Sequence, residues 1–410
     1  MAPLLRIVPV LCILGLSACN QATQTNIQQE KVSLEFFTPK DETETIFEEL
    51  INEFEAQNPE VEINQVIVPN GMNVLKTRIA RGDTPDLFVT YPIEQDYVIR
   101  AKNGYLLDLS DEKFIRNIEP SIQDRYLVNG RMFGIALTQN AVGVLYNKNH
   151  FKELNLTVPE TWDSFIETME KLKAAGKTPM LMPNSEADQT SIFNLNLVAN
   201  QFDNNYWEQG EITIKDSREW KDISKKILTV LSYVQPNSFS DDFFEANQKF
   251  AQEEGTMYIM GTWALPEIEK INPDLNYGIF PFPATNQADD NIVLGGVDIG
   301  LAISSDTPYP EEAKKFLEFL TQAVNAQRLS DYEGSISTVR GVENKREEVS
   351  KLFEKIKEGK SKNWPNHYWR GGTASESDFR KYSLQFFYDK NVSEYLGNLD
   401  KMFQQYNSHP

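Results

Sequence analysis

The chain has 410 residues, and its 40 Lys and Arg residues against 60 Asp and Glu residues give a net charge of −20. Such a negative field repels nucleic acid and anionic lipid headgroups, so the composition argues against a protein that binds either of them through charge. The length predicts two domains, and the aromatic content of 11% is high for an acidic chain.

The start of the chain has the pattern of an export signal. Residues 4–16 form a short, mostly apolar run with Arg6 near its start. The run is too short to cross a bilayer as a permanent helix, which takes roughly 20 apolar residues, and it has the length of a signal-peptide core. It ends in the sequence LSAC at residues 16–19, which resembles the bacterial lipobox. The resemblance implies removal of residues 1–18 and lipid on Cys19, which would hold the exported protein at the outer face of the cell membrane; an ordinary secretory signal is the alternative.

Cysteine and histidine usage limits the chemistry of the mature chain. Cys12 and Cys19 are the only cysteines, so after processing no disulfide, thiolate metal site or cysteine nucleophile is expected. The histidines, which show no metal-ligand spacing, are His150, His367 and His409. No phosphate loop, nucleophile elbow or dinucleotide fingerprint is present. We therefore expect no catalytic residue, no metal and no cofactor.

Strands and helices alternate at the start of the folded part, which follows a polar tether at residues 19–30. Apolar runs and alternating patterns predict strands at residues 32–37, 61–68 and 86–90. Helical spacing of apolar residues predicts helices between them, at residues 45–56 and 75–81. This order is typical of a parallel sheet covered by helices, so the expected fold class is α/β.

Later segments continue the mixed pattern. The apolar run at residues 133–146 is broken by Thr138, Gln139 and Asn140, which predicts two strands instead of one helix. Residues 161–175 predict a capped helix. Strands are also expected at residues 276–282 and 293–303, and helices at residues 311–320, 344–360 and 378–406.

Four stretches between residues 82 and 320 carry the most specific motifs. The first is GDTPDLF at residues 82–88, and the second combines residues 133–137, 144–148 and 158–163. The third is GTMYIMGTW at residues 255–263, and the fourth is GGVDIGLAI at residues 295–303, followed by the helix at residues 311–320. In this order they resemble the family 1 extracellular solute-binding proteins of ABC importers, which include maltose-binding and multiple-sugar-binding proteins.

The resemblance implies a type II periplasmic-binding-protein-like fold, with a hinge and a ligand cleft between two α/β lobes. Lobe one would comprise residues 31–139 and 283–335, and lobe two residues 140–282 and 336–410, with crossovers near residues 138–142, near residues 281–284 and after about residue 335. Because ligands of open α/β sheets lie beyond the carboxyl ends of the strands, two such lobes that face each other can bury a ligand by hinge closure.

The same resemblance implies a monomeric, lipid-anchored substrate-binding protein. It would capture a carbohydrate, expected to be an oligosaccharide, and deliver it to the permease subunits of an ABC transporter, without being an enzyme. A surface glycoside hydrolase is one alternative, but it would need two carboxylates about 5–10 Å apart across a cleft, and no acid here has a hydrolase-like motif around it. A ligand-sensing lipoprotein with the same fold is the other alternative.

Trp263 and Asn140 are the leading candidates for contact with such a ligand. Trp263 ends an apolar strand just after Gly261, where the family places a sugar-stacking aromatic residue, and a flat indole matches the C–H face of a sugar ring. Asn140 stands in the polar break, where the family often has a polar or acidic residue that reaches a sugar hydroxyl, and an amide both donates and accepts. A core tryptophan and a turn asparagine are the alternatives.

The glycine-rich strand at residues 293–303 offers three more candidates. The charge of Asp298 is costly in an apolar strand unless it is paired or faces a cleft. Gly295 and Gly296 would expose backbone N–H groups to a ligand. A buried structural aspartate is the alternative for Asp298.

The remaining candidates follow predicted strands or lie in an aromatic cluster. Trp369 belongs to the sequence WPNHYWR at residues 364–370 and would either close over the ligand or pack inside its lobe. The residues that follow predicted strands, at the expected edge of the cleft, are Thr38, Lys40, Asp41, Thr90 and Tyr91. An ordinary loop position is the alternative for each of them.

Overall fold

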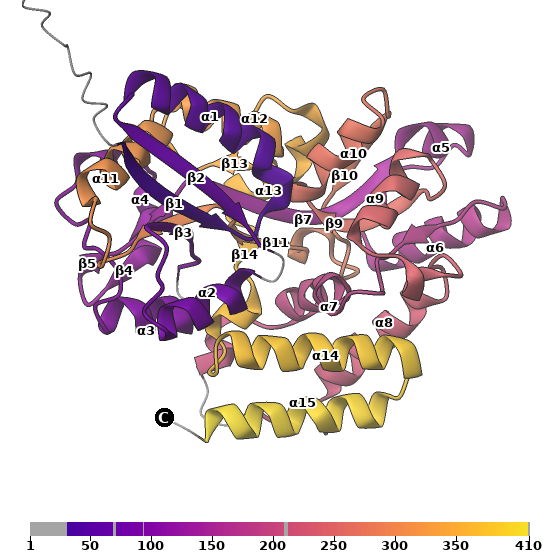
Figure 1. The fold of residues 1–410 in the computed structure, drawn as a ribbon. Coiled ribbons are helices and arrows are strands. Elements are labelled where there is room, and N and C mark those ends of the chain that lie inside the picture. Colours follow the sequence, from indigo (N-terminus) through magenta and orange to yellow (C-terminus); the bar gives the residue numbers. More distant parts are fainter. Residues whose placement is uncertain (1–30, 69–70, 93, 209–211, 409–410) are drawn as a thin grey trace, which may run out of the picture.

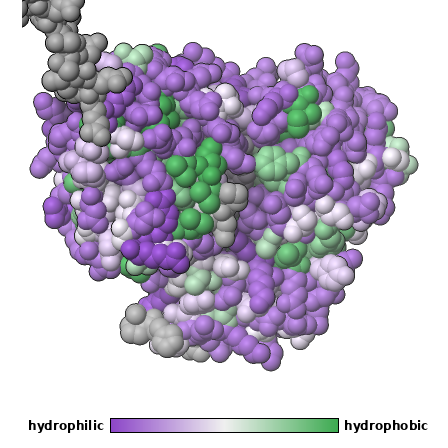
Figure 2. Space-filling model, viewed as in Figure 1, coloured by the Kyte–Doolittle hydropathy of each residue, from purple (hydrophilic) through white to green (hydrophobic). Residues whose placement is uncertain are grey.

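The computed structural model describes residues 31–68, 71–92, 94–208 and 212–408. The expected signal peptide, the lipidation site Cys19 and the tether lie outside these residues. Two β-sheets stand side by side, and helices cover both (Figure 1). No helix in the described part has the length and apolar character that crossing a membrane requires. Figure 2 shows a mostly hydrophilic face with separate apolar areas, in keeping with the acidic composition.

The first sheet has the strand order β2-β1-β3-β12-β6. β1 (Val32–Thr38), β2 (Val61–Ile67) and β3 (Leu87–Val89) are parallel, as predicted, whereas β12 (Gly300–Ile303) and β6 (Ile135–Ala136) are antiparallel to their neighbours. Because strand side chains alternate between faces, each face of this sheet has its own apolar core. These cores also include residues of α1 (Glu44–Gln57), α2 (Gly71–Ala80), α3 (Gln95–Lys102), α4 (Pro120–Gln123), the hairpin of β4 (Leu127–Val128) and β5 (Arg131–Met132), α11 (Pro310–Leu320) and α12 (Ala323–Glu333).

The second sheet is built around β7 (Thr138–Asn147). Its antiparallel partners are β9 (Met257–Gly261), β10 (Tyr277–Phe280), β11 (Val293–Val297) and β13 (Ile336–Ser337). The edge strands are β8 (Met180–Leu181) and β14 (Ser361–Lys362). Its single large core takes in residues of α5 (Lys148–Glu153), α6 (Trp162–Ala174), α7 (Ala187–Gln201), α8 (Arg218–Leu231), α9 (Phe243–Ala251), α10 (Leu265–Ile271), α13 (Ser350–Lys357), α14 (Thr373–Asp389) and α15 (Val392–Asn407).

Local signals set several helix ends. A capping box between Thr161 and Ser164 begins α6, as the sequence predicted. The predicted helix at residues 378–406 is two helices, because Lys390 takes a left-handed conformation, with φ at 59°, and ends α14. The side chain of Asn391 then caps α15, which packs back against α14.

Within the described residues, the chain passes between the two sheets at several places. The first passage is Leu137, between β6 and β7, at the polar break of the sequence. The second is at residues 298–299, so the predicted strand at residues 293–303 is two strands in different sheets. Further on, β13 pairs with β7 of the second sheet, Val339 and Val342 pack on the first sheet again, and Val349 lies in the core of the second, so the last passage lies between Val342 and Val349.

The second passage differs from the sequence-based expectation, which put a crossover at residues 281–284. Phe282 and Ala284 are buried in the core of the second sheet, and the strand that follows, β11, pairs with β7. Val293 and Leu294 fill the same core, so the chain stays with the second sheet until β11 ends.

Candidate ligand-binding site

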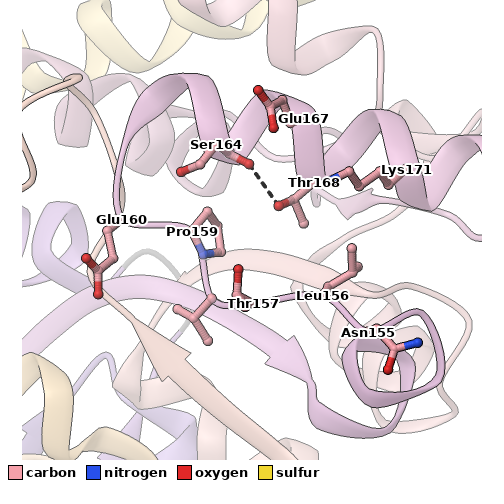
Figure 3. A pocket seen from close by; sticks show the side chains of 10 residues that line it. Asn155, Leu156, Thr157, Pro159, Glu160, Ser164, Glu167, Thr168 and Lys171 are labelled. Atoms are coloured by element: carbon pink, nitrogen blue, oxygen red, sulfur yellow. Dashed lines mark hydrogen bonds between the residues drawn. The ribbon is translucent and has the colours of Figure 1, made fainter.

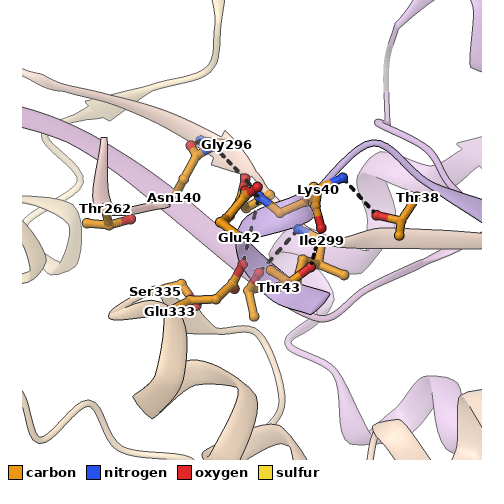
Figure 4. Close-up of polar contacts among 12 residues, drawn as sticks. Thr38, Lys40, Glu42, Thr43, Asn140, Thr262, Gly296, Ile299, Glu333 and Ser335 are labelled. Atoms are coloured by element: carbon orange, nitrogen blue, oxygen red, sulfur yellow. Dashed lines mark hydrogen bonds and ion pairs between the residues drawn. The ribbon is translucent and has the colours of Figure 1, made fainter. Parts of the chain in front are cut away.

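Several predicted site residues come together where the chain crosses between the sheets (Figure 4). β7 and β11 pair here, with Gly296 opposite Asn140. Asp298 directly follows β11, and Lys40 reaches it from the loop after β1. The crossing strands therefore gather polar residues that are far apart in the sequence.

The ammonium group of Lys40 is the centre of a buried charged cluster. Its Nζ lies 2.6 Å from a carboxylate oxygen of Glu42, 3.0 Å from one of Asp298 and 3.8 Å from one of Glu333. These four side chains are at most 10% exposed. Asp298 also accepts a hydrogen bond from Nδ2 of Asn140 at 3.0 Å. The cluster thus joins the loop after β1 to both strands at the crossing.

One lysine faces three carboxylates in a buried place, and the pKa values of Lys40, Glu42 and Glu333 shift there. Burial alone would lower the pKa of Lys40, but the carboxylates raise it well above its ordinary value. Burial and the nearby charge of Asp298 raise the pKa of Glu333 to about 8. Burial also raises the pKa of Glu42, and the charge of Lys40 opposes this. At neutral pH the cluster therefore keeps a proton on a carboxyl group, chiefly on Glu333.

The amide of Asn140 is largely occupied by the protein itself. Its Oδ1 accepts hydrogen bonds from the backbone N–H of Gly296 at 3.0 Å and from Nε1 of Trp364 at 3.4 Å. Since Nδ2 donates to Asp298, one N–H of the amide is left for a ligand hydroxyl. The structure thus gives Asn140 a positioning role that the sequence did not indicate.

The two glycines of β11, Gly295 and Gly296, let neighbouring groups pack close to the strand. Only one of their two N–H groups could be available to a ligand. The N–H of Gly296 is bonded to Asn140, so the expectation that it faces a ligand is wrong. A Cβ on Gly295 would lie 2.3 Å from the carbonyl oxygen of Asn140, and one on Gly296 would lie 3.2 Å from the indole of Trp364. Their lack of a side chain lets β7, β11 and Trp364 pack together.

Two tryptophans stand beside this cluster. Trp263 is half-buried at the end of β9, and its ring centroid lies 6.0 Å from that of Trp364, with 45° between the ring planes. A Cβ on Gly261 would overlap the indole of Trp263, so glycine is required there. Trp364 was not among the predicted site residues. The available signal was the aromatic sequence at residues 364–370, which contains it.

Thr90 and Tyr91, which directly follow β3, are polar residues without a charge. Tyr91 is partly buried, and its ring centroid lies 6.0 Å from that of His367. Burial raises the pKa of Tyr91 well above its ordinary value and, with nearby arginines, lowers the pKa of His367 to about 4. Both side chains are therefore neutral at neutral pH. Thr90 is fully buried, and its Oγ1 has no hydrogen-bond partner among the described residues.

The other predicted positions differ in their surroundings. The expectation that Trp369 closes over a ligand is wrong, because it is only 3% exposed and packs with Phe379 and Phe403 at centroid distances of 4.8 and 5.2 Å. Thr38 is buried, and its Oγ1 accepts a hydrogen bond from the backbone N–H of Lys40 at 3.1 Å, which shapes the loop. Asp41 is exposed just after this loop.

A polar hollow of about 100 Å³ lies next to Asn140. Arg125 enters from the first sheet's side, and its Nη1 donates to Oδ1 of Asn363 at 2.6 Å. Amide and guanidinium groups of this kind suit the hydroxyl groups of a ligand. The lining consists of Arg125, Gln139, Asn140, Asn204, Gly295, Gly296, Ile356, Ser361, Lys362 and Asn363.

A larger hollow of about 450 Å³ lies elsewhere, beside the start of α6 (Figure 3). Residues 155–171 provide its whole lining, so it belongs to the second sheet's side alone, and no predicted site residue takes part. The hydroxyl of Thr168 already donates to the backbone of Ser164 at 2.8 Å. Closure between two lobes would not bury a ligand there. Within the described residues no three metal-ligating side chains come together.

Comparison with known proteins identifies the family. Residues 40–327 match the family described as bacterial extracellular solute-binding protein. The multiple sugar-binding protein of Streptococcus mutans is 30% identical, over 98% of this chain and 96% of that protein. RafE in complex with raffinose is 27% identical, with a TM-score of 0.84 over 92% of this chain and 100% of that chain. The apo form of RafE from Streptococcus pneumoniae, also 27% identical, gives a TM-score of 0.76 over 92% and 98%.

These likenesses agree with the two-lobed α/β fold that the sequence predicted. The TM-score is higher for RafE with raffinose, at 0.84, than for the apo form, at 0.76. The family match covers well over half of the chain, and the chain belongs to the bacterial extracellular solute-binding proteins.

Proposed function

We propose that this protein binds an oligosaccharide between its two lobes outside the cell and delivers it to an ABC permease. The observation that carries the proposal is the pair of Trp263 and Trp364 beside a hollow lined with amide and guanidinium groups. Indole faces cover the C–H faces of sugar rings, while the polar groups bind hydroxyls. The likeness to RafE with raffinose supports an oligosaccharide of that size and class.

Hinge closure is the proposed mechanism. We assign residues 31–137 and 299–342 to lobe one, and residues 138–298 and 343–408 to lobe two, because these ranges follow the two sheets and their cores, with β13 as the one strand of lobe one that pairs across to the second sheet. Since a ligand touches both lobes only when they are closed, binding shifts an existing equilibrium toward the closed form. The higher TM-score to RafE with raffinose supports the closed form as the one described here.

Titration of the mature protein with raffinose tests this function. We expect saturable heat in calorimetry, a higher unfolding temperature through mass action, and recovery of the sugar intact, because no step of the proposal breaks a bond. Absence of binding across a panel of mono- and oligosaccharides would refute the proposal. Release of monosaccharides above a protein-free blank would favour the glycoside hydrolase alternative.

We also propose that lipid on Cys19 holds the protein at the cell membrane, near its permease, with residues 20–30 as the tether. Cys19→Ala is expected to move the protein from the membrane pellet to the soluble fraction, because the acceptor for the lipid is gone. Cys12→Ala is the matched control: that cysteine would leave with the signal, so the protein stays in the pellet. Pellet retention of Cys19→Ala would contradict the anchor.

A further inference from the structure

Helix α3 of lobe one meets the beginning of α14 of lobe two, at a place separate from the crossing strands. Tyr97 and Ala101 of α3 are buried in a core of the first sheet. Phe379 and Phe386 of α14 are buried in the core of the second. The contact between the two helices therefore joins elements that are each fixed to a different lobe.

Three hydrogen bonds cross this contact, and a fourth, from Lys76 to Asp96, lies within lobe one. Oδ2 of Asp96 accepts from the backbone N–H of Thr373 at 3.1 Å, and Nζ of Lys76 donates to Oδ1 of Asp96 at 3.0 Å. Nζ of Lys76 also donates to Oγ1 of Thr373 at 3.1 Å. Beside them, Oε1 of Gln95 accepts from the backbone N–H of Gly371 at 2.5 Å. Two residues of α3 thus hold the start of a helix in the other lobe.

Asp96 acts as a cap for a helix to which it does not belong. Thr373 is the first residue of α14. The N-cap position before it is Gly372, which has no side chain that could cap the helix. The φ of Gly372 is 54°, and a Cβ there would lie 3.0 Å from Asp96, so glycine lets the helix end approach the carboxylate. A carboxylate at a helix N-terminus pairs with a free N–H and with the positive end of the helix dipole.

Asp96 remains ionised although its side chain is largely buried. Its side chain is 10% exposed, against 47% for that of Lys76. Burial alone would raise the pKa of Asp96, but hydrogen bonds from Lys76 and Thr373 hold it below its ordinary value. The contact is therefore charge-assisted at neutral pH, which makes its hydrogen bonds stronger than those between neutral groups.

We propose that Asp96 is a closure latch, a residue that sets the affinity for the ligand without touching it. When the lobes separate, α14 loses its cap and Asp96 returns to water; when they close, the cap forms again. Because the contact exists only in the closed form, it shifts the open–closed equilibrium toward that form and thereby tightens ligand binding. The ligand-free protein is expected to populate both forms. The inference rests on the proposed hinge closure.

Two substitutions at Asp96 and one control test the latch by calorimetry with raffinose. Asp96→Ala removes both acceptors and is expected to raise Kd by about tenfold or more, the effect of losing a charged hydrogen bond. Asp96→Asn keeps one acceptor for Thr373 and should raise Kd less. The control is Asp108→Asn, which breaks an ion pair with Arg131 inside lobe one and should leave Kd unchanged. A Kd of Asp96→Ala equal to that of the unmodified protein would overturn the latch.

Hydrogen exchange of the ligand-free protein tests the latch without any sugar. The amide of Thr373 is protected only while Asp96 accepts its hydrogen, so Asp96→Ala should speed exchange in a peptide covering residues 371–377, and Asp108→Asn should not. Equal exchange in the unmodified protein and Asp96→Ala would contradict the latch. Failure of the unmodified protein to bind any oligosaccharide would refute the proposed function, and the exchange experiment would still decide the latch.

Discussion

Trp263→Ala is expected to weaken oligosaccharide binding by about 1–3 kcal/mol, which is roughly a 5- to 150-fold rise in Kd. The indole of Trp263 is half-buried next to that of Trp364, at the end of β9 and beside the crossing strands. Alanine removes both its apolar area and its flat face, so a sugar ring loses its stacking partner. Calorimetric titration of the variant with raffinose measures the loss.

Two further variants make this result specific. Trp364→Phe keeps a ring but removes the hydrogen bond to Asn140, so it should weaken binding less than Trp263→Ala does. Tyr388→Ala removes an aromatic side chain that is 74% exposed on α14, and should leave affinity unchanged. Equal affinities of Trp263→Ala and the unmodified protein would exclude Trp263 from the site.

Local patterns were sufficient for most of the first sheet. The period of the apolar residues predicted β1, α1, β2, α2 and β3 to within a few residues, because each element buries one regular face. The passage at residues 298–299 was not predictable in this way. β11 and β12 belong to one apolar run that only Asp298 interrupts, and pairing with distant strands assigns its two halves to different sheets.

In the candidate site, too, the sequence around a residue predicted some features, whereas contacts between distant parts of the chain were not predictable. A charge in an apolar strand must be paired or face a cleft, and Asp298 is paired, whereas its role in ligand binding stays a prediction. The sequence did not reveal that the partner would be Lys40, because the two residues are 258 positions apart. Trp364 and Trp369 share one aromatic sequence, and the packing of Phe379 and Phe403 decides which of them is in the core. Sequence reasoning chose Trp369, which is in the core, because the sequence does not show that those helices pack against it.

Glu333→Gln is expected to stabilise the protein at alkaline pH. Burial and the charge of Asp298 raise the pKa of Glu333 to about 8 in the folded protein, whereas the unfolded chain releases this proton near the ordinary value of about 4.3. From that value up to about pH 8, the folded protein holds a proton that the unfolded chain has lost, so the free energy of unfolding falls as the pH rises. Glutamine is neutral in both states and removes this loss, which amounts to roughly 1–4 kcal/mol.

Chemical unfolding at pH 5, 7 and 8.5 measures this effect. The gain in the free energy of unfolding of Glu333→Gln over the unmodified protein should be smallest at pH 5 and largest at pH 8.5. Glu48→Gln is the control: that side chain is exposed on α1, and its replacement should change stability little at any of the three values. A constant difference between Glu333→Gln and the unmodified protein would mean that Glu333 titrates alike in the folded and unfolded chains. In that case Glu333 would be ionised at neutral pH in the folded protein, in spite of its burial.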